Sequence, residues 1–557
     1  MSHNIIGSFT GGTCRYRDAG FISHEETVNM FEETVETSDT YTKKILRSVE
    51  GTSIFATLEG AGPCRGMHVA TCSPESSVNA GDEMLYGVFG SSLYRVYQDG
   101  SYFLVGDVSN NGEIVSFAET SGVPGYLCIC SNHQVYAVNL TLPDGEASIS
   151  ALTLPVRAGG TDNISPTMIT ALNYRIIVND YGKDYFYYSE LGKPNGTDDQ
   201  HAFYQYKTRY AYTKKDGTEV AFSDNQYYAP SEDSYVDGTL QKEDVWMGSL
   251  NFIKAEFRND PIVAIKAVDA FMLVLGSSTY QIYQWQDSLY TPYITTGKTS
   301  SIGCKAPKSA AEVNGRVVFL GSSSTGYNSI WSVGEDGVTR ISKDWLERRI
   351  STMTRSDDAF GYSYTKDGHQ FYLISFPTED VTYCYDFAED SWTTRATRDE
   401  TKNTLRMWFP SFAMRCYGKI MLGSYRENSV VYLDEDKFTD HAGRLIQRTR
   451  VTGIIINDFK DMILHSLELI IDNGRTASAD PSSDGYNPRV MLQVSFDGGY
   501  TWEPECWADA GRQGQYGYST RWSHLGKGRR VAFRVSFTDP APFTVASAML
   551  DYTKCGR

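Results

Sequence analysis

The sequence lacks a long hydrophobic run. Its longest apolar stretch, Ile262 to Leu275, is interrupted by Lys266 and Asp269 and is too short to span a bilayer. The first residues lead into a polar segment rather than the apolar core of a signal peptide. We therefore expect a protein that is made and folded in a cytoplasm and makes no stable membrane insertion.

Residue groupings typical of enzymes and metal sites are also lacking. The 10 cysteines include no CxxC pair, and the 9 histidines show no metal-ligand spacing. There is no G-x-S-x-G elbow, H-E-x-x-H helix or P-loop. The acidic clusters Asp434–Asp436 and Glu389–Asp390 are better explained as solvated loops than as catalytic pairs. We expect no catalytic, cofactor-binding or metal-binding residues, no cofactor, no enzymatic activity, and cysteines that are reduced and buried.

An excess of positive charge is missing as well. The chain has 51 Lys and Arg against 68 Asp and Glu, a net charge of −17. From Lys437 onward there are 15 basic and 13 acidic residues, so the first 436 residues carry −19. Tight DNA binding needs clustered Lys and Arg and is not expected. The acidity also fits ordinary solubility.

What is present points to β structure. Helical periodicity is confined to about two turns at Asp344–Ile350, whereas 38 tyrosines favour pleated, half-buried surfaces. A hairpin pattern, in which an apolar strand is followed by a short turn and an aromatic strand, occurs seven times. Its turns fall at positions 90, 131, 179, 276, 321, 375 and 423. Apart from the 97-residue step from 179 to 276, the steps of 41 to 54 residues are the length of a four-stranded propeller blade.

The sequence therefore predicts an all-β protein with a six- to seven-bladed β-propeller over residues 46–436, preceded by an N-terminal arm, residues 1–45. The long step contains a tyrosine-rich segment, residues 198–252, which we interpret as an inserted β-rich excursion; a missed eighth blade is the alternative. Tyrosine-dense surface loops are more often protein contacts than catalytic elements. The candidate contact residues in the excursion are Tyr204, Tyr210, Tyr227 and Tyr228.

After residue 436 the repeat ends. Short alternating strands at Met462–Ile471, Arg489–Phe496, Val531–Phe537 and Thr544–Tyr552 predict a C-terminal antiparallel β-sandwich, residues 437–557. Arg529 and Arg530 are candidate contacts with a neighbouring subunit or an acidic partner, with simple solvation equally compatible.

One short motif in this C-terminal region is specific. Residues 495–502, Ser-Phe-Asp-Gly-Gly-Tyr-Thr-Trp, fit the S-x-D-x-G-x-T-W Asp-box that recurs in sialidases. In the box the carboxylate satisfies turn amides and does not touch substrate. A single copy outside the propeller predicts a structural turn and gives little support to a sialidase.

Eight short blocks, in order, carry a resemblance to a known family. They are Val28–Glu32, Leu46–Gly51, Cys64–Met67, Asp260–Ile265, Leu275–Tyr283, Gly303–Pro307, Gly526–Val535 and Asp539–Pro542. The ordered set resembles the packaged-DNA stabilisation, or tail hub (nozzle), proteins of short-tailed bacteriophages. Glu50 stands where that family usually has proline, and the segment 198–252 looks like an addition.

The resemblance implies a structural virion protein of the phage tail, assembled in the host cytoplasm. Such a protein forms a homo-hexameric ring below the portal and adaptor proteins, extends the DNA channel, and carries tail fibre or spike proteins and a plug. Genomic DNA would be retained there and then pass through the lumen during ejection without tight binding. The alternative is a propeller glycosidase or depolymerase acting on host envelope sugar, because two catalytic acids could lie on different blades. A secreted lectin is less compatible, since it should have a signal peptide and paired cysteines.

Overall fold

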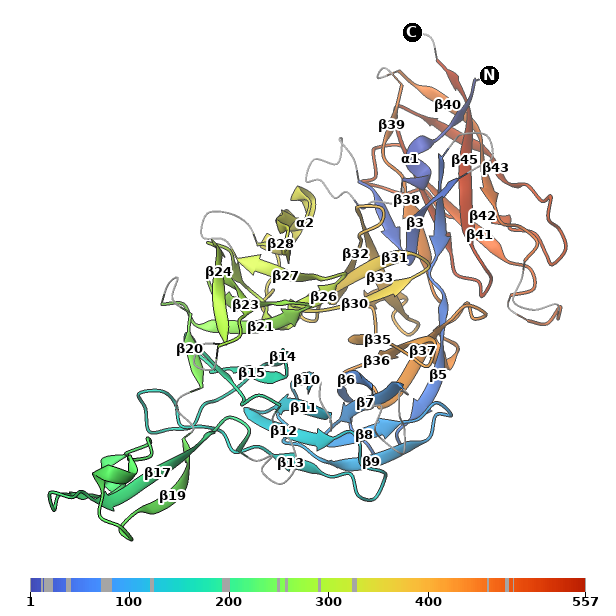
Figure 1. Cartoon of the computed structure of the whole chain (residues 1–557). Coiled ribbons are helices and arrows are strands. Elements are labelled where there is room, and N and C mark those ends of the chain that lie inside the picture. The colour runs from blue at the N-terminus through green and yellow to red at the C-terminus, as the bar shows by residue number, and fades with distance from the viewer. Residues whose placement is uncertain are drawn as a thin grey trace. The chain divides into compact units, whose positions relative to one another are not determined.

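The computed structural model describes residues 2–11, 14, 24–36, 42–71, 83–120, 125–192, 201–247, 251–255, 259–288, 292–322, 328–457, 460–475, 480–483 and 485–555. Nearly all of their regular secondary structure is β-strand (Figure 1). The chain divides into two compact units. The first unit comprises Met1–Met67, Gln98–Tyr102 and Lys305–Arg557, and the second comprises His68–Tyr97 and Phe103–Cys304.

The second unit is built on four successive four-stranded sheets, each with its strands side by side in chain order. Their strands are β6 (Cys64–Thr71), β7 (Glu83–Phe89), β8 (Ser92–Val96) and β9 (Tyr102–Asp107); β10 (Ser116–Thr120), β11 (Tyr126–Ser131), β12 (Gln134–Asn139) and β13 (Ile149–Ala151); β14 (Ile169–Leu172), β15 (Arg175–Asn179), β16 (Tyr185–Tyr188) and β20 (Phe252–Lys254); β21 (Ile262–Val268), β22 (Phe271–Gly276), β23 (Tyr280–Trp285) and β24 (Tyr293–Ser300).

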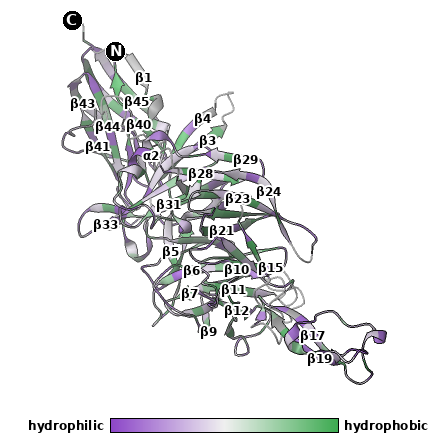
Figure 2. Ribbon diagram, turned by 90° about the vertical axis from the view of Figure 1, so that its left-hand side faces the viewer, coloured by the Kyte–Doolittle hydropathy of each residue, from purple (hydrophilic) through white to green (hydrophobic). Residues whose placement is uncertain are grey.

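In three of these four sheets the second strand is buried along its whole length. Every residue of β11, β15 and β22 is buried, because hydrophobic clusters join each sheet to the next. Such strands are continuous apolar runs rather than alternating ones, and β11 and β21 are coloured mainly as hydrophobic in Figure 2. The turn after β11 places Asn132 and His133 at φ 47° and 63°, as a two-residue hairpin turn requires.

The first unit contains three further sheets of the same kind. Their strands in this unit are β26 (Ala311–Val313), β27 (Arg316–Ser322), β28 (Ser329–Gly334) and β29 (Gly337–Arg340); β30 (Phe360–Lys366), β31 (His369–Phe376), β32 (Val381–Asp386) and β33 (Ser391–Asp399), with β34 (Thr404–Met407) beside β33; and β35 (Phe412–Cys416), β36 (Lys419–Gly423), β37 (Ser429–Asp434) and β5 (Gly51–Thr57). The described residues thus form seven sheets of blade type. Helix α2 (Asp344–Ser351) lies where the short helix is predicted.

The seventh sheet is closed by a strand from the other end of the chain. β5 pairs antiparallel with β37, with Gly51 opposite Asp434 and Thr57 opposite Ser429. The sequence repeat predicts the hairpin of β36 and β37, and it carries no information about which strand completes this sheet. A strand donated from the opposite terminus ties the two ends of the repeat region together.

The remainder of the first unit is a β-sandwich that contains both ends of the chain (Figure 1). One sheet has the order β3-β4-β45-β40-β43, with β1 also on β45, and the other has β2-β38-β44-β41-β42, with β39 on β44. The strands are β1 (Ser2–Ile5), β2 (Glu26–Val28), β3 (Met30–Glu36), β4 (Thr42–Ser48), β38 (Arg448–Val451), β39 (Ile455–Ile456), β40 (Met462–Ile471), β41 (Arg489–Ser495), β42 (Cys506–Asp509), β43 (Thr520–Gly528), β44 (Arg530–Phe537) and β45 (Thr544–Lys554). The four strands predicted for the sandwich are present.

The segment predicted as an N-terminal arm supplies strands β1–β4 and helix α1 (Gly7–Thr10) to this sandwich. Ile6, Phe9, Met30 and Leu46 belong to the same hydrophobic core as β40, β41, β44 and β45. β2 also pairs with β33, so one sheet continues from the blade β30–β33 into the sandwich.

Candidate functional site

A small separate sheet stands between β16 and β20 of the third blade sheet and lies apart from the blade sheets of its unit (Figure 1). It has the order β18-β17-β19, with β17 at Gln205–Thr213, β18 at Glu219–Val220 and β19 at Gln241–Met247. The 3-10 turns Phe222–Asp224 and Glu232–Ser234 complete it. We call residues 205–247 the inserted sheet. The β-rich insertion predicted within 198–252 is therefore present, while 193–200 and 248–250 lie outside the described residues.

The base of the inserted sheet is held by polar contacts. The Gln205 amide donates to Asn251 Oδ1, and the Asn251 amide donates to Glu190 Oε1 over 2.8 Å. Ala202 and Phe203, just before it, are fully buried in the core of the blade sheets, and Phe252 already belongs to β20. The inserted sheet proper is thus shorter than the predicted segment.

The four candidate tyrosines occupy different environments. Tyr204 is half-buried against the blade core and its hydroxyl donates to the Leu154 carbonyl over 3.1 Å; burial raises its pKa. The Lys242 ammonium lies 6.0 Å from the Tyr210 ring centre, and that of Lys207 lies 5.7 Å from the Tyr227 ring centre. Tyr228 is 81% exposed. Tyr204 therefore has a packing role, and Tyr228 is the tyrosine most available to another molecule.

The register divides the side chains of the inserted sheet between two faces. Arg209 is opposite Glu243, with which it forms an ion pair, and it also stacks on Phe222 at 5.6 Å. Tyr210 and Tyr212 alternate with Arg209 and so point to the other face. No side chain described in 205–247 is buried; those of Tyr206 and Trp246 lie outside the description. The sheet thus presents two polar-aromatic faces that its own chain leaves open to solvent.

Arg529 and Arg530 lie at one end of the sandwich. The Arg529 guanidinium and the Lys527 ammonium both bind the Asp461 carboxylate, over 2.6 Å and 2.8 Å. The Arg529 side chain is 66% exposed, whereas Arg530 is half-buried. Arg529 is thus available for a contact at the molecular surface.

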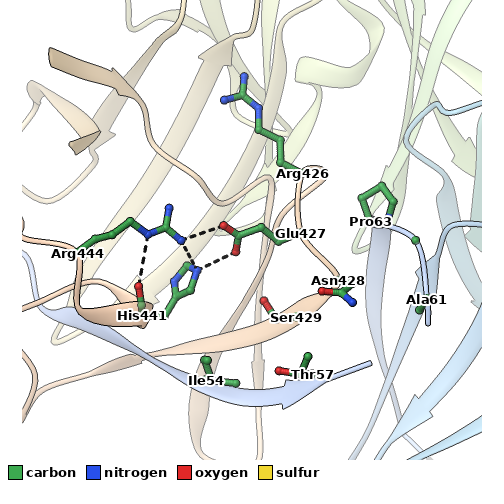
Figure 3. A pocket seen from close by; sticks show the side chains of 11 residues that line it. Ile54, Thr57, Ala61, Pro63, Arg426, Glu427, Asn428, Ser429, His441 and Arg444 are labelled. Atoms are coloured by element: carbon green, nitrogen blue, oxygen red, sulfur yellow. Dashed lines mark hydrogen bonds and ion pairs between the residues drawn. The ribbon is translucent and has the colours of Figure 1, made fainter. Parts of the chain in front are cut away.

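An open pocket of about 460 Å³ lies beside the closing strand β5. The residues that line it are Ile54, Thr57, Ala61, Gly62, Pro63, Arg426, Glu427, Asn428, Ser429, His441 and Arg444. Glu427 accepts from His441 Nε2 over 2.8 Å and from Arg444 over 3.0 Å, while Arg426 is turned away (Figure 3). Sequence reasoning missed this cluster, because no local pattern links residues 427, 441 and 444 to β5.

The pocket does not have the acids of a glycosidase. That chemistry uses two carboxyl groups facing one bond, one of them protonated. Glu427 is the one carboxyl group among the lining residues, and its hydrogen bond from His441 lowers its pKa to about 2 despite partial burial. Asp440 is next to the pocket, but it is buried and does not line it. Glu427 is thus a permanently ionised anchor for His441 and Arg444.

The Asp-box forms the predicted turn. Asp497 accepts hydrogen bonds from the amides of Tyr500 and Thr501, the Thr501 hydroxyl and the Ser495 hydroxyl, over 2.6 to 3.0 Å. Burial opposes ionisation of Asp497, but these hydrogen bonds outweigh it and lower its pKa to about 2. Every bond is internal to the turn or to its strand, so the motif stabilises a hairpin.

The cysteines of the described residues carry no disulfide. Seven are buried, Cys506 is exposed and Cys555 is half-exposed; burial raises the pKa of Cys14 and Cys64 to about 12. No group of three His, Cys, Asp or Glu side chains suited to a metal ion occurs in the described part of the chain. Within that same part, no helix has the length and apolarity needed to cross a membrane.

The fold is that of a β-propeller protein with an appended β-sandwich. The chain belongs to the bacteriophage P22 Gp10 family. Residues 9–438 match the family model described as Bacteriophage P22 Gp10, beta-propeller, and residues 447–553 match Bacteriophage P22 Gp10, beta-sandwich. The predicted family and fold class are confirmed. The family is one of structural phage proteins associated with stabilisation and the tail.

Two solved structures illustrate a remote likeness. Virginiamycin B lyase from Staphylococcus aureus is 9% identical, with a TM-score of 0.38 over 68% of this chain and 98% of the lyase. BamB from Moraxella catarrhalis is also 9% identical, with a TM-score of 0.32 over 69% of this chain and 100% of BamB. Such low scores give no basis for assigning an activity. A search of curated proteins found no match to this sequence.

Proposed function

We propose that this protein is the hub, or nozzle, of a short phage tail and a component of the virion. Six copies form a ring below the portal and adaptor proteins, extend the DNA channel, retain the packaged DNA and let it leave during ejection. Tail fibre or spike proteins and a plug attach to the same ring. The observation that carries the proposal is the ordered match of both domains to one structural phage family.

The charge of the chain supports this role. The net charge is −17, and the first 436 residues, which include all seven blade sheets, account for the whole excess. A channel wall that neutralised phosphates would hold DNA by releasing its counterions and would resist sliding. An acidic wall repels DNA, so the genome can be confined by the ring without adhering to it.

The test uses tail-less particles that carry the adaptor and lack this protein. Purified protein is added, the mass of the protein is measured by light scattering before and after addition, and DNA release from the particles is followed on warming. The proposal predicts a hexamer, or a monomer that becomes a ring on the particle, together with slower DNA release.

A stable monomer that ignores the particles and liberates sugar from host polysaccharide would overturn the proposal. The Glu427→Gln variant is the matched control for that outcome, since it removes the one carboxyl group lining the pocket. Sugar release that disappears in this variant would assign the activity to the pocket. Sugar release that persists would mean that the catalytic carboxyl groups lie outside this pocket.

A further inference from the structure

The inserted sheet is rich in aromatic residues, and yet its described side chains are exposed or only partly buried. Residues 205–247 include eight aromatic residues, yet none of the side chains described there is buried. Tyr228 and Val236 are 81% and 43% exposed. A sheet of three short strands needs a covered apolar face for stability, and aromatic side chains are enriched where proteins meet. These properties indicate that another molecule covers the inserted sheet.

The free end of the inserted sheet is acidic. Positions 214 to 237 contain six acidic residues and only two lysines. The acids are Asp216, Glu219, Asp224, Glu232, Asp233 and Asp237. Asp216 and Asp224 accept backbone hydrogen bonds within their own turns, and no ion pair of these six acids occurs within the described residues. The charge at this end is therefore available to a basic partner.

One end of the sandwich has the opposite character. Met462 at the start of β40 is opposite Gly528 on β43 and Lys554 on β45, and Arg530 is opposite Ile456. Among the described residues, this brings together the cations Lys460, Lys527, Arg529, Arg530 and Lys554, with Asp461 and Asp497 as neighbouring acids. Asp497 is already occupied by its own turn. Ile456 and Ile463 are each 41% exposed among these cations. We call this surface the basic end.

We infer that the acidic end of the inserted sheet docks on the basic end of the sandwich of a second copy of this chain. The two surfaces are complementary in charge, and each offers exposed apolar side chains: Tyr228 and Val236 on one, Ile456 and Ile463 on the other. Charge complementarity of this kind selects the partner and fixes the register of an interface, while apolar contact adds stability.

A contact between two different surfaces has a geometric consequence. Each copy offers one acidic end and one basic end, so the contact is heterologous and closes into a ring when its rotation permits. The inference rests on the proposed function, because it supplies the joint between neighbouring copies of the hexamer. It assigns the inserted sheet to ring formation rather than to holding a fibre or plug.

The test reverses the charges on each side separately. Variant A carries Lys527→Glu and Arg529→Glu, and variant B carries Glu232→Lys and Asp233→Lys; all four side chains are more than half exposed or on exposed turns. Control variants of equal charge change are Arg475→Glu with Arg512→Glu, both exposed and near the opposite end of β40, for the sandwich, and Glu146→Lys with Asp162→Lys for the second unit. Folding of each is checked by circular dichroism and protease resistance.

Ring assembly is measured by native mass at low salt and on tail-less particles. Variants A and B should each assemble at least about tenfold less well than the wild type and the controls, and an equimolar mixture of A and B should recover assembly. Recovery occurs because half of the contacts in the mixture are native and the other half have both charges reversed. A chain carrying all four changes should also assemble.

The outcomes separate the inference from the proposed function. Rings that form equally well with A and B would overturn the inference and leave the hub role standing. Recovery in the four-change chain without recovery in the mixture would place the contact within one chain and overturn the inference as well. A wild type that forms no ring alone or on particles would overturn the hub itself. If the wild type binds duplex DNA and variant A has lost that binding, the basic end would be assigned to phosphate binding instead.

Discussion

Two sheets of the second unit follow one another in the sequence but differ in the burial of their side chains. In sheet β14-β15-β16-β20, every residue of β15 and all but one of β16 are buried. The inserted sheet, which interrupts it between β16 and β20, has no buried side chain among those described. Both are rich in tyrosine. The difference shows that aromatic content alone does not tell whether a sheet is covered by its own chain.

The largest expected effect comes from uncovering a sheet that is normally covered. Removal of residues 1–50 deletes β1–β4 from the sandwich and takes Ile6, Phe9, Met30 and Leu46 out of its core. Four buried apolar side chains contribute roughly 6 to 12 kcal/mol, which equals the whole stability of a typical domain. Hydrogen exchange should show loss of protection in β40, β44 and β45. Protection that survives would mean that residues 447–553 fold without the N-terminal strands.

A smaller effect is expected from one residue of each sheet. Phe186 in β16 is fully buried and its ring lies edge-on to Tyr283 at 5.2 Å. Phe186→Ala should cost about 4 kcal/mol, whereas Tyr228→Ala in the inserted sheet should change stability by less than about 0.5 kcal/mol. The two changes in the free energy of unfolding are measured by urea titration, with protease resistance of the second unit as the readout. Similar losses for the two variants would contradict the contrast between the sheets.

A buried carboxyl group and an exposed one should differ in how they make the stability of the protein depend on pH. Asp440, 4% exposed beside the closing strand β5, has its pKa raised by burial from 3.8 to about 6, although His441, Arg444 and Arg448 oppose the rise. The folded protein therefore binds an extra proton between about pH 4 and pH 6. The stabilisation from this proton is complete below about pH 4 and is lost as the pH rises through about 6.

The Asp440→Asn variant should lack that loss. Relative to the wild type, its free energy of unfolding should improve by about 3 kcal/mol from pH 3 to pH 7. The control is Asp216→Asn in the inserted sheet, where hydrogen bonds from Thr218 lower the pKa and no such trend is expected. Denaturant titrations at several pH values measure the difference. Parallel profiles for the wild type and Asp440→Asn would show that Asp440 ionises freely in the folded protein.

The smallest effect on stability is expected from excising the inserted sheet. Gln205 and Met247 are opposite one another in the register, so residues 206–246 can be replaced by an Asn-Gly turn. The free energy of unfolding of the second unit should change by less than about 0.5 kcal/mol, because no described buried side chain is removed. Native mass should then show weakened assembly. Unfolding of the second unit would instead mean that the inserted sheet stabilises its own chain.

Much of this protein could be predicted from local sequence. The hairpin repeat, the strands Met462–Ile471 and Thr544 onward, the short helix at Asp344, the Asp-box turn and the insertion after β16 all depend on alternation, turn residues and spacing over fewer than about 50 residues. The family resemblance depends instead on the eight short blocks of residues between Val28 and Pro542. Local patterns suffice for the hairpins because their strands pair with neighbours in the chain, and for β40 and β45 because alternation marks a strand whatever its partner.

Only the tertiary structure decided which distant segments meet. β5 completes a sheet with β37, β1 and β4 pair with β45, and His441 joins Glu427 and Thr52, in contacts that link residues up to about 550 positions apart. It also decided that Tyr204 packs inside while Tyr228 faces solvent. Alternation tells which face of a strand is apolar, but the partner of that face is chosen by the packing of the whole chain, because burial depends on three-dimensional neighbours.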